Sequence, residues 1–167
     1  MPETVIAARP GGRPVPDPAG GAAAGSPVRP IRPDDLDAAT GLWLAEVRWD
    51  AQFGPATERP STTRAIRQQL RDVLSRDQPW TWVAEDAAGG PAGLLVVNPP
   101  ERAEWIARLT SAAPVGYLSC LVVAAGRRGG GLGGALVRQA HAALDAAGVG
   151  VTAHRHYADE CVVGLAP

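Results

Sequence analysis

The sequence predicts an α/β fold, in which helices flank a mixed β-sheet. The first observation below predicts the fold class, and the other two indicate a single globular domain. Segments with the 3.6-residue periodicity of helices alternate with short apolar runs rich in Val and Leu. A length of 167 residues suits one domain with one core. The hydrophobic content of 46% and the charged content of 20% are those of an ordinary soluble globular protein.

The first 27 residues are expected to form a disordered leader. Eight of the 16 prolines lie in residues 1–33, interleaved with Gly and Ala. Such a segment has little apolar surface to offset the entropy lost on ordering. A short strand is predicted at residues 28–32. The folded domain is therefore expected to span residues 28–153, with an atypical tail at residues 154–167.

Two amphipathic helices are predicted next. Asp34 can cap the first, whose apolar positions recur at helical spacing from Leu36 to Val47. Ser61 or Thr62 begins the second. Its apolar face consists of Ile66, Leu70 and Val73 or Leu74.

The second half of the chain alternates strands with helices. Residues 80–86 and 92–98 are predicted strands joined by a hairpin, because Gly89-Gly90 permits the positive φ angles of a tight turn. The remaining predicted elements are a short helix or ordered loop (100–113), a buried strand (115–123), a helix from Leu132 that ends at Gly148, and a last strand (149–153).

Composition excludes several classes of function. The net charge is −1, so binding to nucleic acid or to an anionic membrane is not expected. All 16 basic residues are arginine, which excludes any mechanism that needs lysine. Two cysteines are too few for a disulfide framework and suit a reducing compartment. No signal-peptide pattern begins the chain, and no apolar run reaches the ~18 residues of a membrane span. The predicted location is therefore cytoplasmic.

A glycine-rich turn lies between the predicted strand at 115–123 and the helix after it. Five glycines fall within residues 129–134, directly after Arg127 and Arg128. A helix that begins in such a turn offers unpaired amides and a partial positive charge to an anion. No Asp or Glu occurs from Trp105 to Leu144, which also favours a polyanionic ligand.

Three ligand classes compete for this turn. A P-loop requires a lysine and is excluded. The spacing Gly129-x-Gly131-x-x-Gly134 matches a dinucleotide fingerprint, but residues 124–128 separate it from its strand and no acidic residue ends the next strand. The third class is the pyrophosphate of coenzyme A. A turn that only lets the helix pack tightly on the sheet is the structural alternative.

Residues 120–149, CLVVAAGRRGGGLGGALVRQAHAALDAAGV, resemble motif A of the GCN5-related N-acetyltransferase (GNAT) family. In that motif an apolar strand and a short turn lead into R-x-x-G-x-G/A at the start of a helix. Arg128, Gly131 and Gly133 fill these positions here. The resemblance covers about residues 28–153 and implies the family's mixed, mainly antiparallel sheet flanked by helices.

The resemblance implies acetyl-CoA as cosubstrate and direct transfer of its acetyl group to a primary amine of a small molecule or peptide. The strand at 118–123 would pair with the pantetheine arm, and amides of residues 119–121 would polarise the thioester carbonyl. Amides of residues 128–133 would bind the pyrophosphate. The residues expected to hold the cosubstrate are Leu121, Val123, Arg128, Gly129, Gly130, Gly131, Leu132 and Gly133.

A general base is also expected, because an ammonium must lose a proton before it attacks. The candidates are Glu46 and Asp50, in and after the first helix, and Glu85 at the end of a strand. Trp49 and Phe53 lie close to the first two in sequence. They would complete an aromatic and acidic pocket for a cationic amine. The structural alternative for each acid is a solvated helix face or strand end.

Cysteine and histidine residues give no metal site. Cys120 lies within a strand without an adjacent histidine, so it is predicted to be a small core residue. His154, His156 and Cys161 match no standard zinc spacing, and no metal is predicted. His141 is predicted to be solvated on its helix.

The chain departs from the family after Ala153. The family continues with an Asn-bearing turn, a helix and two strands, often with a tyrosine that protonates the leaving thiolate. Residues 154–167 leave no room for these elements, so a C-terminally truncated fold is expected. Its last strand would have an open edge, through which two copies of the chain would form a homodimer. Tyr157 is the candidate acid, although it matches no motif.

The alternative function is a non-catalytic acyl-CoA-binding module or an inactive remnant of a GNAT enzyme.

Overall fold

The computed structural model describes residues 4–14, 28–53, 56–78 and 80–157. Within these residues, six strands form one sheet in the order β1-β6-β5-β4-β3-β2. The elements in chain order are β1 (Thr4–Pro10), β2 (Val28–Pro30), α1 (Leu36–Asp50), α2 (Thr62–Leu74), β3 (Thr81–Glu85), β4 (Pro91–Asn98), α3 (Glu104–Ala107), β5 (Val115–Val123), α4 (Leu132–Ala146) and β6 (Val151–Tyr157).

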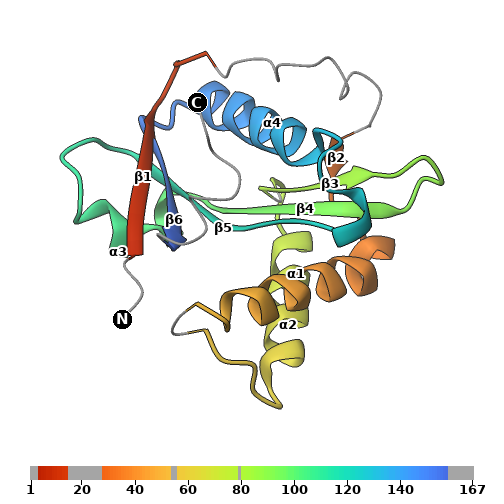
Figure 1. Cartoon of the computed structure of the whole chain (residues 1–167). Helices are drawn as coiled ribbons and strands as arrows, with labels where there is room; N and C mark the ends of the chain where they lie inside the picture. Colours follow the sequence, from red (N-terminus) through yellow and green to blue (C-terminus); the bar gives the residue numbers. More distant parts are fainter. Residues whose placement is uncertain (1–3, 15–27, 54–55, 79, 158–167) are drawn as a thin grey trace.

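The sheet lies between two helical layers (Figure 1). Helix α4 covers one face, and helices α1 and α2 cover the other. Under α4, Leu136 and Leu144 are completely buried against side chains of β3, β4 and β5. On the opposite face, Leu70 of α2 is completely buried against the same three strands. Each such leucine contributes roughly 1.5–3 kcal/mol by leaving water.

The predicted fold class is confirmed, because the described sheet is mixed and mainly antiparallel. Among its strand pairs, only β5 and β6 run parallel. The helices and strands predicted between residues 28 and 123 appear with boundaries that differ by a few residues. The last strand differs more, since β6 continues to Tyr157, four residues beyond the predicted end. None of the helices in the described part of the chain has the length and apolar character needed to cross a membrane.

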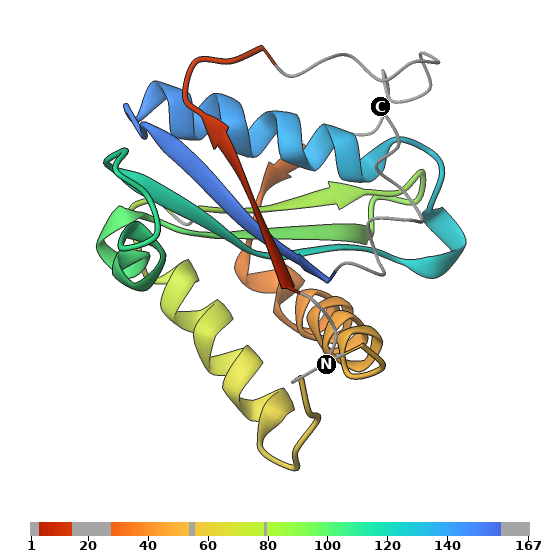
Figure 2. The ribbon, with the colours of Figure 1, turned by 60° about the vertical axis from the view of Figure 1, so that its left-hand side comes forward.

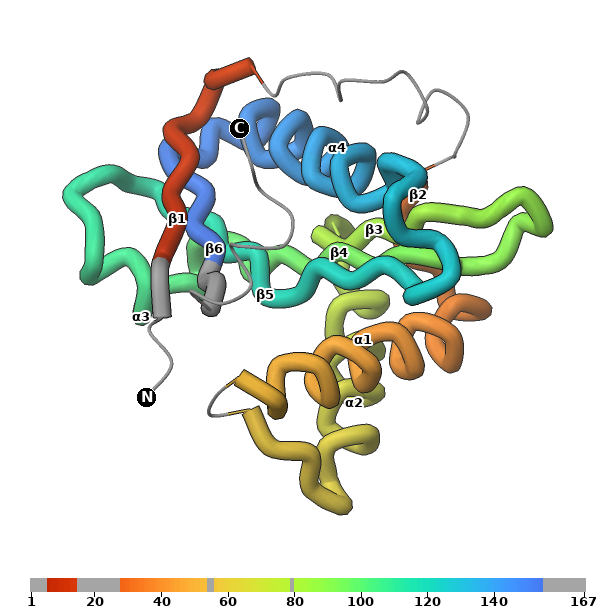
Figure 3. Tube along the Cα trace, viewed as in Figure 1, coloured from red at the N-terminus to blue at the C-terminus, as the bar shows by residue number. Residues whose placement is uncertain are grey.

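The prediction that residues 1–27 lack structure is wrong for residues 4–10, which form strand β1. This strand pairs antiparallel with β6, from Thr4 opposite Tyr157 to Pro10 opposite Val151. Figure 3 shows these segments from the two ends of the sequence lying side by side. Thr, Val and Ile favour a strand at the start of the segment, and Pro10 is its last residue, where a missing N–H costs little. The prediction of a disordered leader depended on the average composition of a long proline-rich stretch, and that average hides the short strand-forming run at residues 4–10.

The edge of the last strand, which was expected to be open, is covered. Strand β1 lies next to β6 and is itself the edge strand of the sheet (Figure 2). The edge of β6 is therefore not available for the predicted homodimer, because its backbone groups are paired within the chain.

Contacts beyond the strand ladder tie the end of β1 to the end of α4. The guanidinium of Arg9 donates to both carboxylate oxygens of Asp145, at 3.1 and 2.9 Å. The amide of Gly12 donates to the same carboxylate at 3.0 Å, and the amide of Gly11 donates to the carbonyl of Gly150 at 2.8 Å. The hydrogen bond from Arg9, helped by that from Gly12, lowers the pKa of Asp145 to about 2.

His141 is buried, so the prediction that it is solvated is wrong. Its exposed fraction is 9%, and within the described residues its Nδ1 atom has no hydrogen-bond partner. His141 precedes Asp145 by one turn of α4, so both lie on the helix face that β1 reaches. Burial, and then the charge of Arg9, lower the pKa of His141 to about 4, whereas Asp145 opposes this shift.

The burial of the His141 imidazole predicts that the free energy of unfolding depends on pH. Between pH 6.5 and about 4, His141 is protonated in the unfolded chain but neutral in the folded one. Acidification through this window therefore favours unfolding, and His141 lowers the free energy of unfolding by up to about 3 kcal/mol. Urea unfolding at pH 7 and pH 4.5 measures the loss. The variant His141→Leu, of similar volume, should lose this part of the pH dependence, and an unchanged dependence would contradict the assignment.

Candidate functional site

Strands β5 and β6 pair over only part of their lengths. The parallel pairing runs from Val115 opposite Val151 to Leu118 opposite His154. Beyond it, among the residues that the structure describes, the two strands continue without pairing to each other. The ring Nδ1 of His154 lies 3.1 Å from the carbonyl oxygen of Leu118, where the pairing ends. The second half of β5 thus presents backbone groups toward a gap in the sheet.

A β-bulge occurs at the same place. Leu118 lies opposite Val97 and Cys120 lies opposite Val96, which leaves Ser119 as the extra residue of β5. Its hydroxyl donates to the carbonyl of Val96 at 3.2 Å. A bulge redirects the backbone that follows it and is common next to active sites. This bulge could not be predicted from the sequence, because it depends on the register between β4 and β5.

The glycine-rich turn connects the end of β5 to α4. Gly129 and Gly131 have φ angles of 80° and 81°, a left-handed conformation that glycine adopts without strain. Gly131 is the N-cap residue of α4. Among the described residues, no backbone hydrogen bond of a turn, loop or cap uses the amides of residues 129–134 as donors. The turn therefore presents unpaired amides at the positive end of the helix dipole.

The two arginines before the turn have defined positions. Arg127 forms an ion pair of 2.8 Å with Asp86 of the β3–β4 hairpin and lowers the pKa of that carboxyl. Arg128 donates through Nε to the carbonyl of Val123 at 3.1 Å. Its guanidinium carbon lies 5.5 Å from the centre of the Trp49 ring, a cation–π contact with α1. The sequence gives no sign of this role for Asp86, since only the fold brings the hairpin to the turn.

The structure brings Glu46 to β5. The carboxylate oxygen Oε1 of Glu46 accepts a hydrogen bond of 3.1 Å from the amide of Leu121. The completely buried Cys120 lies beside the same carboxylate. Burial, and then the charge of Glu46, raise the pKa of the Cys120 thiol, which agrees with its predicted role as a core residue. The negative charge of Asp50 acts in the same direction, so both acids of α1 lie near β5.

Two aromatic rings lie next to these acids. Trp49 and Phe53 contact each other with ring centres 5.5 Å apart. Trp49 has an exposed fraction of 41%, so its ring is open to solvent as well as to Arg128. The residues predicted as an aromatic and acidic group thus lie together at the end of α1.

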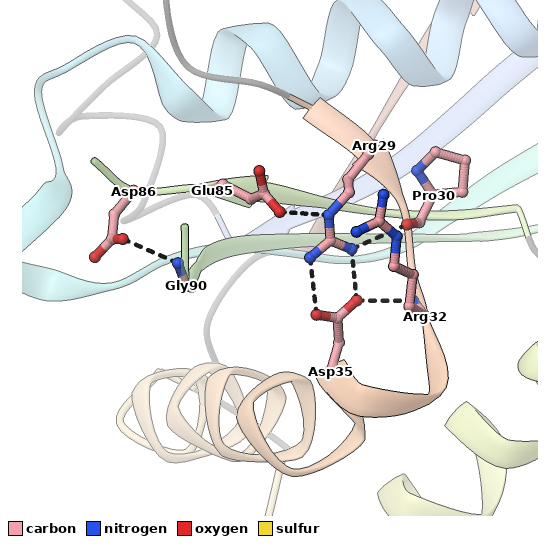
Figure 4. A network of polar contacts seen from close by, with 7 residues as sticks. All are labelled: Arg29, Pro30, Arg32, Asp35, Glu85, Asp86 and Gly90. Atoms are coloured by element: carbon pink, nitrogen blue, oxygen red, sulfur yellow. Dashed lines mark hydrogen bonds and ion pairs between the residues drawn. The ribbon is translucent and has the colours of Figure 1, made fainter. Parts of the chain in front are cut away.

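Glu85 lies in a different network (Figure 4). Arg29 of β2 donates to Glu85 and also to both carboxylate oxygens of Asp35, at 2.6 and 3.0 Å. Burial opposes ionisation of Asp35, but the hydrogen bonds from Arg29 and the Arg32 amide outweigh it and lower its pKa. Asp35 directly precedes α1, and Glu46 lies eleven residues later, about 16 Å further along the helix axis. The structure therefore gives Glu85 an ion-pair partner and does not join it to Glu46.

The remaining candidates lie at the end of β6. Tyr157 is its last residue and pairs in register with Thr4 of β1, and His156 precedes it. Cys161 lies outside the described residues. Within the described part of the chain, no group of three or more His, Cys, Asp or Glu side chains could hold a metal ion.

Comparison with known proteins places the chain in a family. A family model described as "Acetyltransferase (GNAT) family" matches residues 43–161, more than half of the chain. No curated protein matches the sequence. The chain belongs to the GNAT acetyltransferase family, as the resemblance of motif A predicted.

Solved structures have the same fold at low sequence identity. A GCN5-related N-acetyltransferase from Ralstonia eutropha JMP134 is 24% identical, with 86% of this chain and 94% of that chain covered and a TM-score of 0.56. A GNAT family acetyltransferase from Brucella melitensis, in complex with acetyl-CoA, is 21% identical, with coverages of 74% and 71% and a TM-score of 0.50. AAC(6')-Iy, in complex with the bisubstrate analog CoA-S-monomethyl-acetylneamine, is 14% identical, with coverages of 82% and 83% and a TM-score of 0.58.

Proposed function

We propose that this protein transfers the acetyl group of acetyl-CoA to a primary amine of a small molecule or peptide. The observation that carries the proposal is the run of unpaired amides at residues 129–134, next to the half of β5 that does not pair with β6. The Brucella melitensis protein and AAC(6')-Iy, which share the fold, hold acetyl-CoA and a CoA conjugate respectively. Those complexes support the same cosubstrate here.

The proposed cosubstrate site uses mainly backbone groups. The amides of Gly129, Gly130, Gly131, Leu132 and Gly133, with that of Arg128, would bind the pyrophosphate. The backbone of β5 at Leu121 and Val123 would pair with the amides of the pantetheine arm, as a further strand would. The guanidinium of Arg128, which lies between Val123 and Trp49, would add positive charge beside the phosphates.

The proposed reaction is a direct transfer. The neutral amine nitrogen attacks the thioester carbonyl carbon, a C–N bond forms, and the C–S bond breaks. The ammonium form of the substrate loses one proton before attack, and the attacking nitrogen loses a second. The thiolate takes up one proton, so an ammonium and acetyl-CoA give an acetamide, CoA and one net proton. An amide of β5 would stabilise the negative charge that develops on the carbonyl oxygen.

Glu46 is the proposed general base. Of the three acids predicted for this role, it is the one whose carboxylate lies against the amide of Leu121, and Asp50 lies nearby. Trp49 and Phe53 would hold a cationic amine close to these carboxylates. Tyr157 is the proposed acid for the thiolate, on the basis of its place at the end of β6. Glu85 is not carried into the proposal, because Arg29 holds it elsewhere.

Two measurements on the purified chain test the proposal. Acetyl-CoA at 100 times its Kd should stabilise the folded state by about 2.7 kcal/mol, which appears as a rise in Tm. A panel of primary amines should then include at least one that causes release of free CoA thiol. Stabilisation without thiol release for any amine would indicate a non-catalytic acyl-CoA-binding module. The absence of both would contradict the proposal entirely.

A further inference from the structure

We infer that Glu46 occupies, in the ligand-free protein, the hydrogen-bond position of the acetyl carbonyl oxygen, so that acetyl-CoA must displace it. This inference rests on the proposed function. It assigns Glu46 a second task besides accepting a proton: while its carboxylate holds the amide of Leu121, the empty site discriminates against acetyl-CoA relative to free CoA.

The geometry of β5 leads to this inference. Leu121 lies three residues beyond Leu118, where the pairing with β6 ends. It also follows the bulge at Ser119, so its amide is among those expected to polarise the thioester carbonyl. That amide donates to Oε1 of Glu46 at 3.1 Å. A carboxylate oxygen thus holds the N–H that the acyl oxygen would use.

The two acceptors compete for one donor. An N–H group makes one well-aligned hydrogen bond, and a bond to a carboxylate is stronger than a bond to a neutral carbonyl. Acetyl-CoA therefore binds more weakly than it would if the amide of Leu121 were unoccupied. Free CoA has no acyl oxygen and does not require Glu46 to leave. Loss of the carboxylate should consequently favour acetyl-CoA and leave CoA unaffected.

Displacement also determines when the base becomes available. The neighbouring thiol of Cys120 is held in its neutral form by burial and by Glu46, and a thiol is only a weak donor. Once the acyl oxygen takes the amide of Leu121, the carboxylate of Glu46 no longer accepts a hydrogen bond from that amide. It is then placed to accept a proton from an ammonium held near Trp49. Glu46 would thus begin to act as a base only after the acetyl group is in place.

Calorimetric titration tests the inference with two ligands, acetyl-CoA and CoA, on the same proteins. Glu46→Ala is expected to bind acetyl-CoA about tenfold more tightly than wild type, because the competing charged acceptor is gone. Its Kd for CoA should change by less than about twofold. Glu58→Ala removes an equally charged but exposed side chain that pairs with Arg48, and both of its Kd values should match wild type.

The outcomes separate the inference from the proposed function. If wild type binds both ligands and the ratio of their affinities is the same in Glu46→Ala, the inference is wrong and the proposed function stands. If acetyl-CoA binds more weakly to Glu46→Ala than to wild type, Glu46 assists the acyl group and the inference is likewise wrong. If wild type binds neither ligand, the proposed function itself is overturned, and the inference with it.

A spectroscopic measurement covers the case in which Glu46→Ala folds poorly. In ligand-free protein, the backbone amide resonance of Leu121 should differ between wild type and the milder variant Glu46→Gln, since a charged acceptor is replaced by a neutral one. Saturating acetyl-CoA should bring the two resonances together, and saturating CoA should leave them different. An amide resonance of Leu121 that is identical in the two ligand-free proteins would overturn the inference.

Discussion

Gly131→Asp is expected to weaken acetyl-CoA binding by at least about a hundredfold. Gly131 is the N-cap of α4, at the centre of the unpaired amides that the proposal assigns to the pyrophosphate. A carboxylate there adds a like charge within a few ångströms of the phosphates. At 4 Å and an effective dielectric constant of 20, this repulsion is about 4 kcal/mol per pair of charges, and each 1.4 kcal/mol is a factor of ten in Kd. Titration with acetyl-CoA measures the loss.

Two matched variants separate charge from backbone strain. Gly131→Asn places a neutral side chain of the same shape in the same left-handed conformation, φ 81°, and should lose much less affinity than Gly131→Asp. Gly148→Asp adds the same charge at a residue with a similar φ of 72°, but beyond the opposite end of α4. Its affinity for acetyl-CoA should be close to that of wild type. Equal affinities for wild type and Gly131→Asp would show that the phosphates bind elsewhere.

Local sequence predicted those parts of the molecule that depend on neighbouring residues. Helices α1, α2 and α4 follow from apolar spacing, and the glycine turn follows from a motif whose function lies in its backbone. The position of Glu46 was also predictable in outline, because a helix with a known apolar face has a limited choice of side chains near the sheet. The contact between Glu46 and the amide of Leu121 was not, since it depends on where α1 crosses β5.

The features that the sequence did not reveal depend on contacts between distant residues. Strand β1 pairs with a segment almost 150 residues later, and its composition alone resembles that of a linker. β1 brings the charge of Arg9 close to His141 at the end of α4, so the environment of this histidine could not be assigned before β1 was known. Glu85 was a plausible base until the fold placed Arg29 beside it. In each case a distant part of the chain determines the structure of the segment or the environment of the side chain.

Removal of residues 1–12 is expected to produce the largest loss of stability in this chain. The deletion removes β1 and exposes the backbone N–H and C=O groups of β6 from Val151 to Tyr157. It also removes Arg9 and Gly12, the hydrogen-bond donors to Asp145. We expect a urea midpoint well below that of the full chain. Self-association is also expected, because an uncovered strand edge pairs readily with another chain. Unfolding curves and light scattering after size-exclusion chromatography measure the two effects.

Point variants locate this stabilisation within the N-terminal segment. Arg9→Ala leaves the strand ladder intact but leaves the partly buried carboxylate of Asp145 without its guanidinium partner, at a cost of roughly 1–3 kcal/mol. Arg13→Ala changes the net charge equally at an exposed position and should cost less than about 0.5 kcal/mol. Because the hydrogen bond from Arg9 keeps the pKa of Asp145 near 2, its contribution should be complete above about pH 4 and lost as the pH falls toward 2. A deletion variant that remains monomeric and as stable as the full chain would show that β1 does not hold β6 in solution.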